Sequence, residues 1–144
     1  GAPVLMSDIS IIVRKLRTAA DRCGERWGIG FPEQQVLMLL GAHGPSNQEA
    51  LACQLQIDKG AVARTVAKLE EKGLVTRQVN PANRREKLVS PRLGAEGVLR
   101  EMWELYQQLE AVAYRGLAPD EIDLTRRCLE RIAANLSDPW EEQA

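Results

Sequence analysis

Apolar residues recur every three or four positions along much of the chain, which is the period of an amphipathic helix. The first such stripe predicts a long helix that begins near Leu5 and ends at Gly28 and Gly30. Its apolar members are Ile9, Ile12, Leu16, Ala19, Cys23 and Trp27. A second helix is predicted to begin at Phe31-Pro32, because proline suits the first helical turn, and His43-Gly44-Pro45 ends it.

Two further helices follow, and only the short segment LQID joins them. Ser46 and Glu49 have the spacing of a capping box, so the third helix is predicted from Asn47 to about Gln54. Asp58 is predicted to cap the fourth helix, which Gly73 ends. One face of the fourth helix is apolar, with Val62, Val66 and Leu69, and its other face is predicted to carry Lys59, Arg64, Thr65 and Lys68. The pair indicates a helix-turn-helix.

A β-hairpin is predicted after Gly73, because two short apolar segments flank a turn built from Asn, Pro and Asn. Its strands run roughly from Leu74 to Val79 and from Glu86 to Val89. Arg84 and Arg85 are adjacent at the tip of the hairpin, which projects into solvent, so they do not contribute to a core. The helix-turn-helix is therefore followed by a β-wing.

Two long helices complete the chain. Ser90-Pro91 predicts the start of the fifth helix, with serine as the cap and proline in the first position. The sixth helix begins near Pro119 and is acidic in its first turn, as the helix dipole favours. The apolar residues of these two helices are Val98, Met102, Leu105, Leu109, Val112, Ile122, Leu129, Ile132 and Leu136.

The apolar stripes on the first, fifth and sixth helices contain more apolar surface than the core of one small winged module can bury. They predict a subunit interface in a two-fold homodimer, with a monomeric helical bundle as the alternative. The fold class is mainly α with a small β-wing (α+β), a winged helix-turn-helix with N- and C-terminal dimerisation helices. We assign residues 1–30 and 91–144 to the dimerisation region and residues 31–90 to the winged helix-turn-helix domain.

Charge is distributed unevenly, although the formal net charge is only −1. Between Lys59 and Arg92 there are nine Lys or Arg against three Glu, which gives a local net charge of +6. From Glu101 to the end there are four Arg against ten acids, a net charge of −6. A basic segment that coincides with the helix-turn-helix and the wing is typical of a nucleic-acid-binding face.

Other function classes find little support in the sequence. The three cysteines are far apart and there is one histidine, so neither a metal site nor a disulfide framework is expected. We find no phosphate loop, nucleophile elbow or other cofactor or catalytic motif, and expect no enzyme. The longest apolar run, Val36–Leu40, is too short to span a membrane, and the segment GAPVLMSDIS has no export signal. We expect a cytoplasmic protein.

The segment IDKGAVARTVAKLEEKGLVTRQVNPANRREKLV, residues 57–89, resembles the recognition helix and wing of the multiple-antibiotic-resistance regulator (MarR) family of bacterial transcription factors. Its most specific part is the Leu-Glu-x-x-Gly-Leu-Val-x-Arg passage from Leu69 to Arg77. The resemblance extends over nearly the whole chain. The family wing usually has an Asp-x-x-Asp-Arg-Arg pattern, where this chain has Asn80 and Asn83 before its two arginines. The amides can still make the turn, but an ion pair bracing the arginines is lost.

The resemblance implies a homodimer that binds pseudo-palindromic double-stranded DNA, usually as a repressor, through the recognition helix 58–72 and the wing 74–89. Arginine and threonine on a helix can read guanine and thymine in the major groove, and wing arginines suit the narrow minor groove. The predicted DNA-binding residues are Ser46, Asn47, Gln48, Lys59, Gly60, Ala61, Arg64, Thr65, Lys68, Arg77, Arg84 and Arg85.

The resemblance also implies release from DNA by a small effector, and an aromatic or phenolic compound fits the candidate residues. The pocket would lie between the dimer helices and the winged module, lined by the first, second and fifth helices. Flat apolar walls with one cation suit an aromatic acid. The candidates are Trp27, Phe31, His43, Trp103 and Tyr106, with Arg14 or Arg17 to meet a carboxylate.

Two alternatives remain open at this stage. The first is a redox-sensing repressor that uses Cys23, because Arg22 and Arg26 flank this thiol and nearby cations raise thiol reactivity. The second is a winged-helix protein-interaction module that docks its wing on an acidic partner without binding DNA.

Overall fold

A computed structural model describes residue 1 and residues 3–137 of the chain. The chain divides into two compact units, Gly1–Leu105 and Tyr106–Ala144. Three acids of the acidic C-terminal segment, Asp138, Glu141 and Glu142, lie outside the described residues.

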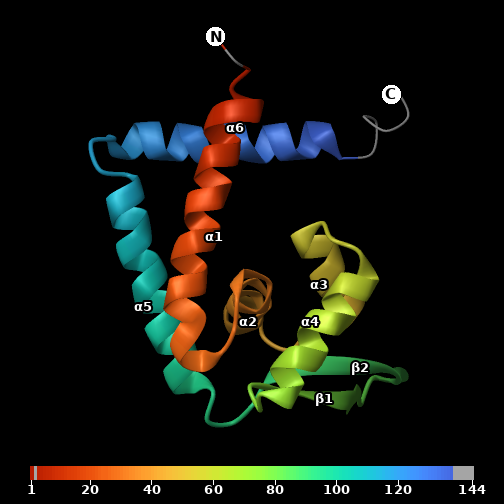
Figure 1. The fold of residues 1–144 in the computed structure, drawn as a ribbon. Helices are drawn as coiled ribbons and strands as arrows, with labels where there is room; N and C mark the ends of the chain where they lie inside the picture. Colours follow the sequence, from red (N-terminus) through yellow and green to blue (C-terminus); the bar gives the residue numbers. More distant parts are fainter. Residues whose placement is uncertain (2, 138–144) are drawn as a thin grey trace. The chain divides into compact units, whose positions relative to one another are not determined.

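The first unit contains the winged module (Figure 1). It begins with the helical segments η1 (Leu5–Ile9), α1 (Ser10–Gly24) and η2 (Glu25–Trp27), and continues with α2 (Phe31–His43), α3 (Gln48–Leu55) and α4 (Lys59–Glu71). The strands β1 (Val75–Asn80) and β2 (Asn83–Pro91) form the hairpin, and α5 (Glu96–Ala113) passes into the second unit. The last helix is α6 (Pro119–Leu136). The predicted order of six helices and a hairpin is confirmed, but β2 extends beyond the predicted Glu86–Val89 at both ends.

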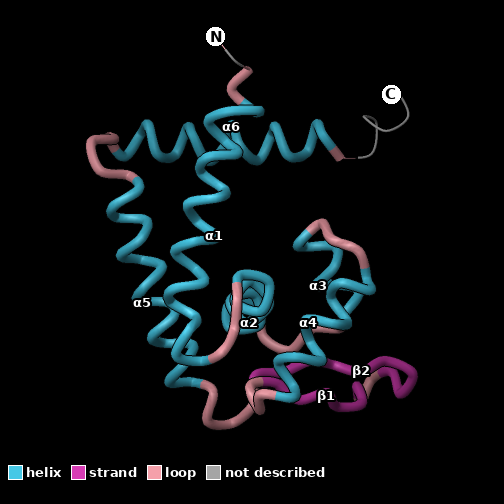
Figure 2. Tube along the Cα trace, in the orientation of Figure 1, coloured by secondary structure: helices cyan, strands magenta, loops and turns pink. Residues whose placement is uncertain are grey.

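The core of the first unit lies where α2, α3 and α4 meet the base of the hairpin. The side chains that are fully buried there are Val36, Leu37, Leu40, Leu51, Val62, Val66, Leu69, Val75 and Val89. Burying each of these aliphatic side chains stabilises the fold by about 1.5–3 kcal/mol before entropy is counted. The far end of the hairpin extends beyond the helices (Figure 2) and carries none of these residues.

The two strands pair antiparallel, with Thr76 opposite Ser90 and Arg77 opposite Val89. Ser46 adds a short bridge to this sheet, because its backbone N–H donates to Val89 O at 3.0 Å and its carbonyl accepts from Val89 N at 2.8 Å. The chain that enters α3 is thereby fixed to the base of the wing.

The prediction that Ser90-Pro91 opens the fifth helix is wrong. β2 continues through both residues, with Pro91 opposite Val75, and α5 begins five residues later at Glu96. A proline is tolerated at the end of a strand, because there its missing N–H interrupts no ladder. The dipeptide pattern thus suits a strand end as well as a helix start, and pairing with β1 decides between them.

Gly24 marks the place where the end of α1 packs against the loop before α2. A Cβ atom at this position would lie 1.8 Å from the carbonyl oxygen of Ile29 and 2.5 Å from Nε2 of Gln34. Gln34 is fully buried on α2, and its Nε2 donates to Ala20 O at 2.7 Å. The close approach therefore requires glycine and fixes α1 to the winged module.

We expect Gly24→Ala to lower the free energy of unfolding by about 1–3 kcal/mol, because the added methyl group overpacks a site bounded by backbone. Gly97→Ala is the matched control, since a Cβ atom at this position of α5 meets nothing within 4 Å. The control should leave stability unchanged or raise it by about 0.5 kcal/mol, because alanine favours a helix over glycine. Urea unfolding measures both variants, and equal midpoints would contradict the packing argument.

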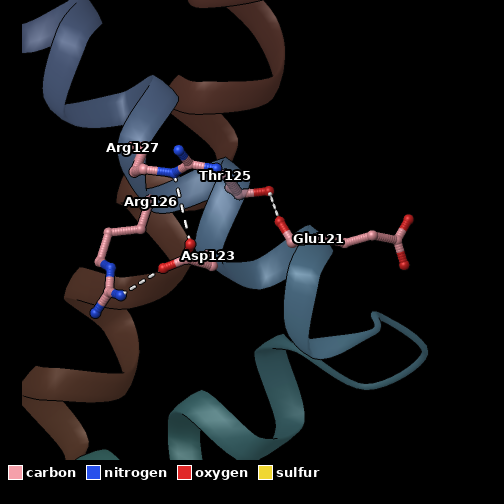
Figure 3. A network of polar contacts seen from close by, with 5 residues as sticks. All are labelled: Glu121, Asp123, Thr125, Arg126 and Arg127. Carbon is pink, nitrogen blue, oxygen red and sulfur yellow. Dashed lines mark hydrogen bonds and ion pairs between the residues drawn. The ribbon is translucent and has the colours of Figure 1, made fainter.

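The second unit contains α6, whose start near Pro119 is confirmed. The N–H of Ala118 donates to the Glu121 carboxylate at 2.9 Å and so closes the first turn. Figure 3 shows Asp123 facing Arg126 and Arg127. The carboxylate pairs with Arg126 at 2.8 Å and with Arg127 at 3.5 Å. The hydrogen bond to Asp123 raises the pKa of Arg126 above its ordinary value.

Apolar side chains remain about half exposed on α6, where Leu124, Leu129 and Leu136 are 54%, 47% and 52% exposed. In the first unit the exposed large apolar side chains of the N-terminal segment are Val4, Leu5, Met6, Ile11, Ile12 and Val13, which are between 41% and 77% exposed. Among the described residues, no helix has both the length and the apolar content needed to cross a membrane.

Candidate nucleic-acid interface

Two side-chain caps set the geometry of the helix-turn-helix. The Asn47 side chain accepts a hydrogen bond from Ala50 N at 2.6 Å, and Asp58 accepts one from Ala61 N at 2.7 Å. Each satisfies an N–H that a helix start leaves without an intrahelical partner. Gln56 ends α3 in a left-handed conformation, with a φ of +57°. The cap of α3 is therefore Asn47, and the predicted capping box of Ser46 and Glu49 is wrong because the backbone of Ser46 pairs with Val89.

The helix α4 presents one buried and one exposed face. Val62, Val66 and Leu69 are fully buried, as predicted. The prediction that Thr65 lies on the exposed face is wrong, because Thr65 is only 8% exposed and its hydroxyl donates to Ala61 O at 2.9 Å. Position 65 lies three residues after Val62 and four before Leu69, which places it on the buried stripe.

Gly60 leaves room for two side chains at the start of α4. A Cβ atom there would lie 3.1 Å from Oδ1 of Asp58 and 3.3 Å from Nη1 of Arg64. The Arg64 guanidinium thus folds over position 60, next to the cap of the helix. The sequence predicts close approach of Gly60 and Ala61 to DNA, and this stays a prediction. The structure gives a separate reason for glycine at position 60, because a larger residue would press on both Asp58 and Arg64.

Ion pairs divide the predicted DNA-binding cations into two groups. Lys59 pairs with Glu49 at 2.8 Å, Lys68 with Glu33 at 3.6 Å and Arg77 with Glu70 at 3.5 Å. Within the part of the chain that the structure describes, Arg64, Arg84 and Arg85 form no ion pair. These three arginines are exposed and keep their charge available for an external anion.

The wing turn is shaped by its two amides. Asn80 Oδ1 accepts from Ala82 N at 3.0 Å, and Asn83 Oδ1 accepts from Arg85 N at 3.2 Å. Asn80 also donates from Nδ2 to the Glu86 carboxylate at 3.2 Å, which an aspartate at this position could not do. The amides therefore hold the turn without neutralising the adjacent arginines.

The start of α3 faces the wing across a hollow of about 470 Å³. Gln48 lines it from α3, and Asn83, Arg85 and Lys87 line it from β2. The backbone N–H of Ser46 is occupied by Val89, so it cannot serve a phosphate as predicted. Arg77 is 27% exposed and next to Glu70 of α4, a position from which it braces the base of the wing.

The predicted effector residues fall in several places. Arg17 and Phe31 come together, with the guanidinium carbon 5.5 Å from the ring centroid, and line a cavity of about 670 Å³ beside α4. Trp103 lines a separate, mainly apolar hollow of about 460 Å³ between α2 and α5. Arg14 lines a third depression on α1, and His43 is exposed at the end of α2.

Trp27 lies under the Arg26 guanidinium at 5.5 Å, while Tyr106 belongs to the second unit. The effector role of all these residues stays a prediction. Cys23 is half-buried, and Arg26 also pairs with Glu101 at 3.2 Å. A redox role for Cys23 stays a prediction too.

Sequence reasoning missed the acids that pair with the cations, which are Glu33, Glu49 and Glu70. None is within helical pairing distance of its partner in the chain. No local pattern marks such pairs, because tertiary packing brings them together.

The fold and this basic surface define a winged helix-turn-helix protein. Residues 32–87 match the model of the MarR family. The crystal structure of MarR is 26% identical, with a TM-score of 0.77, over 98% of this chain and 95% of that one. A MarR transcriptional regulator from Methanosarcina mazei Go1 is 25% identical, with a TM-score of 0.80, over 92% and 96%.

A Listeria monocytogenes protein assigned to the MarR family transcriptional regulators, solved in complex with 26-mer DNA, shares the fold. It is 24% identical, with a TM-score of 0.88, over 97% of this chain and 93% of that one. Residues 32–87 thus form a MarR-family domain, and the chain shares its fold with solved MarR-family regulators.

Proposed function

We propose that the protein is a homodimeric transcriptional repressor that binds pseudo-palindromic duplex DNA and is released by a small ligand. The observation that carries the proposal is the set of exposed arginines without ion pairs on a winged helix-turn-helix, Arg64 on α4 and Arg84 and Arg85 on the wing. Exposed arginines of this kind meet phosphates and base edges without first breaking an internal ion pair. The structure of the Listeria monocytogenes relative with DNA supports this interpretation.

Dimerisation is supported by the half-exposed apolar residues of the N-terminal segment and α6. A chain of this size rarely leaves so many large apolar side chains in water, and a two-fold interface is the commonest way to bury them. Symmetry then requires two copies of α4 to enter successive major grooves, about 34–36 Å apart.

The test of this proposal is selection of duplexes from a random DNA library with the native protein. We expect enrichment of an inverted repeat whose half-sites are about one helical turn apart. Failure to enrich any sequence at low salt would contradict the proposal and would direct attention to an acidic protein partner for the wing.

Glu49→Gln should raise affinity for the selected duplex severalfold. Glu49 puts a negative charge on the proposed DNA face and holds Lys59, whose hydrogen bond lowers the pKa of the Glu49 carboxyl. A glutamate is ionised at neutral pH in any case, so the pair with Lys59 forms there. The substitution removes the repulsion and releases Lys59, so the salt dependence of log K should steepen by about one unit for each additional phosphate that is neutralised.

Glu71→Gln serves as the matched control, since it removes the same charge from the exposed end of α4. Fluorescence anisotropy measures both variants over a salt series. If Glu49→Gln binds no better than the control, Glu49 does not restrain Lys59 at the DNA surface.

A further inference from the structure

The wing arginines lie in an irregular part of the hairpin, toward the end that extends beyond the helices (Figure 2). The two strands pair in register as far as Val79 and Lys87. The next pair is Asn80 with Asn83, so residues 84–86 of β2 are not paired with any residue of the described strand β1. We call residues 84–86 the wing bulge. A bulge bends its strand and redirects the side chains that it carries, so the contacts that hold the wing bulge determine where its arginines point.

The wing bulge places opposite charges next to each other. Arg84 and Arg85 are exposed, and Glu86, which follows them in the chain, is half-buried. Opposite charges this close in the chain attract each other, and an internal pair would reduce the charge that the wing offers to an external anion. Among the described residues, however, Glu86 forms no ion pair. A neutral partner holds its carboxylate instead.

That partner is Asn80, which makes two hydrogen bonds at once. Its Nδ2 donates to the Glu86 carboxylate at 3.2 Å, and its Oδ1 accepts from Ala82 N at 3.0 Å. An amide can donate and accept together, whereas an ionised aspartate has no donor. An aspartate at position 80 would also bring a second negative charge to Glu86, and the two carboxylates would repel each other. The side chain at position 80 therefore controls the direction of Glu86.

We propose that Asn80 is a positioning residue of the wing, which holds Glu86 away from Arg84 and Arg85 and so sets the affinity of the wing for DNA. This inference rests on the proposed function, because the charge of the arginines matters only where the wing meets an anion. When Asn80 does not hold it, Glu86 pairs with an arginine of the wing bulge. DNA must then break this pair before its electronegative minor groove can take up the arginine.

The main test is a double-mutant cycle of Asn80→Ala and Glu86→Gln, measured as affinity for the selected duplex. We expect Asn80→Ala alone to lower affinity about fivefold, because the released Glu86 forms a surface ion pair that DNA must break in each subunit. In the Glu86→Gln background the same substitution should leave affinity unchanged, because no acid remains to pair with the arginines.

Two outcomes of this cycle overturn the proposal. An equal loss of affinity in both backgrounds would mean that Asn80 acts only by shaping the turn through Ala82. No loss in the native background would mean that Glu86 stays away from the arginines without Asn80.

Asn80→Asp should lower affinity more than Asn80→Ala, by at least about tenfold, because it repels Glu86 in addition to releasing it. Gln78→Glu is the matched control, since it adds the same charge to an exposed position of the same strand, opposite Leu88. We expect the control to lose only about threefold or less, since an isolated exposed charge acts weakly through water. Equal losses would reduce the effect at position 80 to its added charge and overturn the proposal.

The position of Glu86 can also be followed without DNA, by NMR spectra of the arginine Nε–H groups. We expect the signals of Arg84 and Arg85 to shift in Asn80→Ala and to return to their native positions when Glu86→Gln is added. Signals that do not shift in Asn80→Ala overturn the inference and leave the proposed function standing. A protein that shows these shifts but selects no duplex overturns the proposed function instead, while the hold of Asn80 on Glu86 remains.

Discussion

Replacing Arg84 and Arg85 together by alanine should lower affinity for the selected duplex about 1000-fold. The proposed homodimer would lose four arginines, and each contact of this kind is worth about 1 kcal/mol or more. Both side chains are exposed on β2 and free of ion pairs among the described residues, so their removal costs the free protein little. The turn itself persists, because Asn80 and Asn83 hold it through backbone N–H groups.

The salt dependence gives an independent measure of the same arginines. If they neutralise phosphates, the slope of log K against log salt should become shallower by about 0.9 for each phosphate that the variant no longer neutralises. Arg126→Ala with Arg127→Ala is the matched control, since it changes the net charge equally and both side chains are exposed on α6. An equal fall of affinity in the control, with its oligomeric state unchanged by sedimentation velocity, would show that overall charge, and not the wing, sets the affinity.

Leu129→Glu should convert the protein to a monomer and lower its affinity for the inverted repeat by about 100-fold or more. Leu129 is 47% exposed on α6, and a two-fold interface would bury it twice. An unpaired carboxylate in such an interface costs several kcal/mol, and a monomer loses the effective concentration that joins two half-sites. Sedimentation velocity gives the oligomeric state, and anisotropy gives the affinity.

Ala134→Glu introduces the same charge on another face of α6 and should remain dimeric. If Leu129→Glu stays dimeric and binds the duplex normally, α6 does not form the interface. If both variants become monomeric, the added charge itself opposes association and the face of α6 is not identified.

The helices and the wing could be predicted because their signals are local. The apolar period places Val62, Val66 and Leu69 on the buried face of α4, and Asp58 marks the start of that helix. Turn residues Asn80 and Asn83 mark the hairpin. These features depend on residues within a few positions of one another, so a single sequence contains them.

The errors arise where distant segments decide the structure. Ser90-Pro91 has a helix-start pattern, but pairing with β1 extends the strand through it. Ser46 has cap spacing, yet its backbone joins Val89, and Asn47 caps α3 instead. Thr65 is polar, which predicts an exposed position, although the packing of α4 buries it.

The exposure of the arginines could be predicted from the sequence, but the ion pairs of the neighbouring cations could not. The basic segment of the sequence identifies the exposed arginines. The acids that form ion pairs with Lys59, Lys68 and Arg77 come from other elements and could not be identified from it. The seven predicted effector residues likewise separate into different places, because a pocket is a product of tertiary packing. The cavity beside α4 brings together Arg17 and Phe31 with Glu33, which no sequence pattern links to them.

We propose that two copies of one winged module read two half-sites on the same face of DNA. The most direct test is the affinity for the selected duplex before and after insertion of 5 base pairs between its half-sites, about half a helical turn. We predict a loss of at least about 100-fold, because the second half-site rotates to the opposite face and the chelate effect is lost. Affinity that is indifferent to the insertion would contradict the claim.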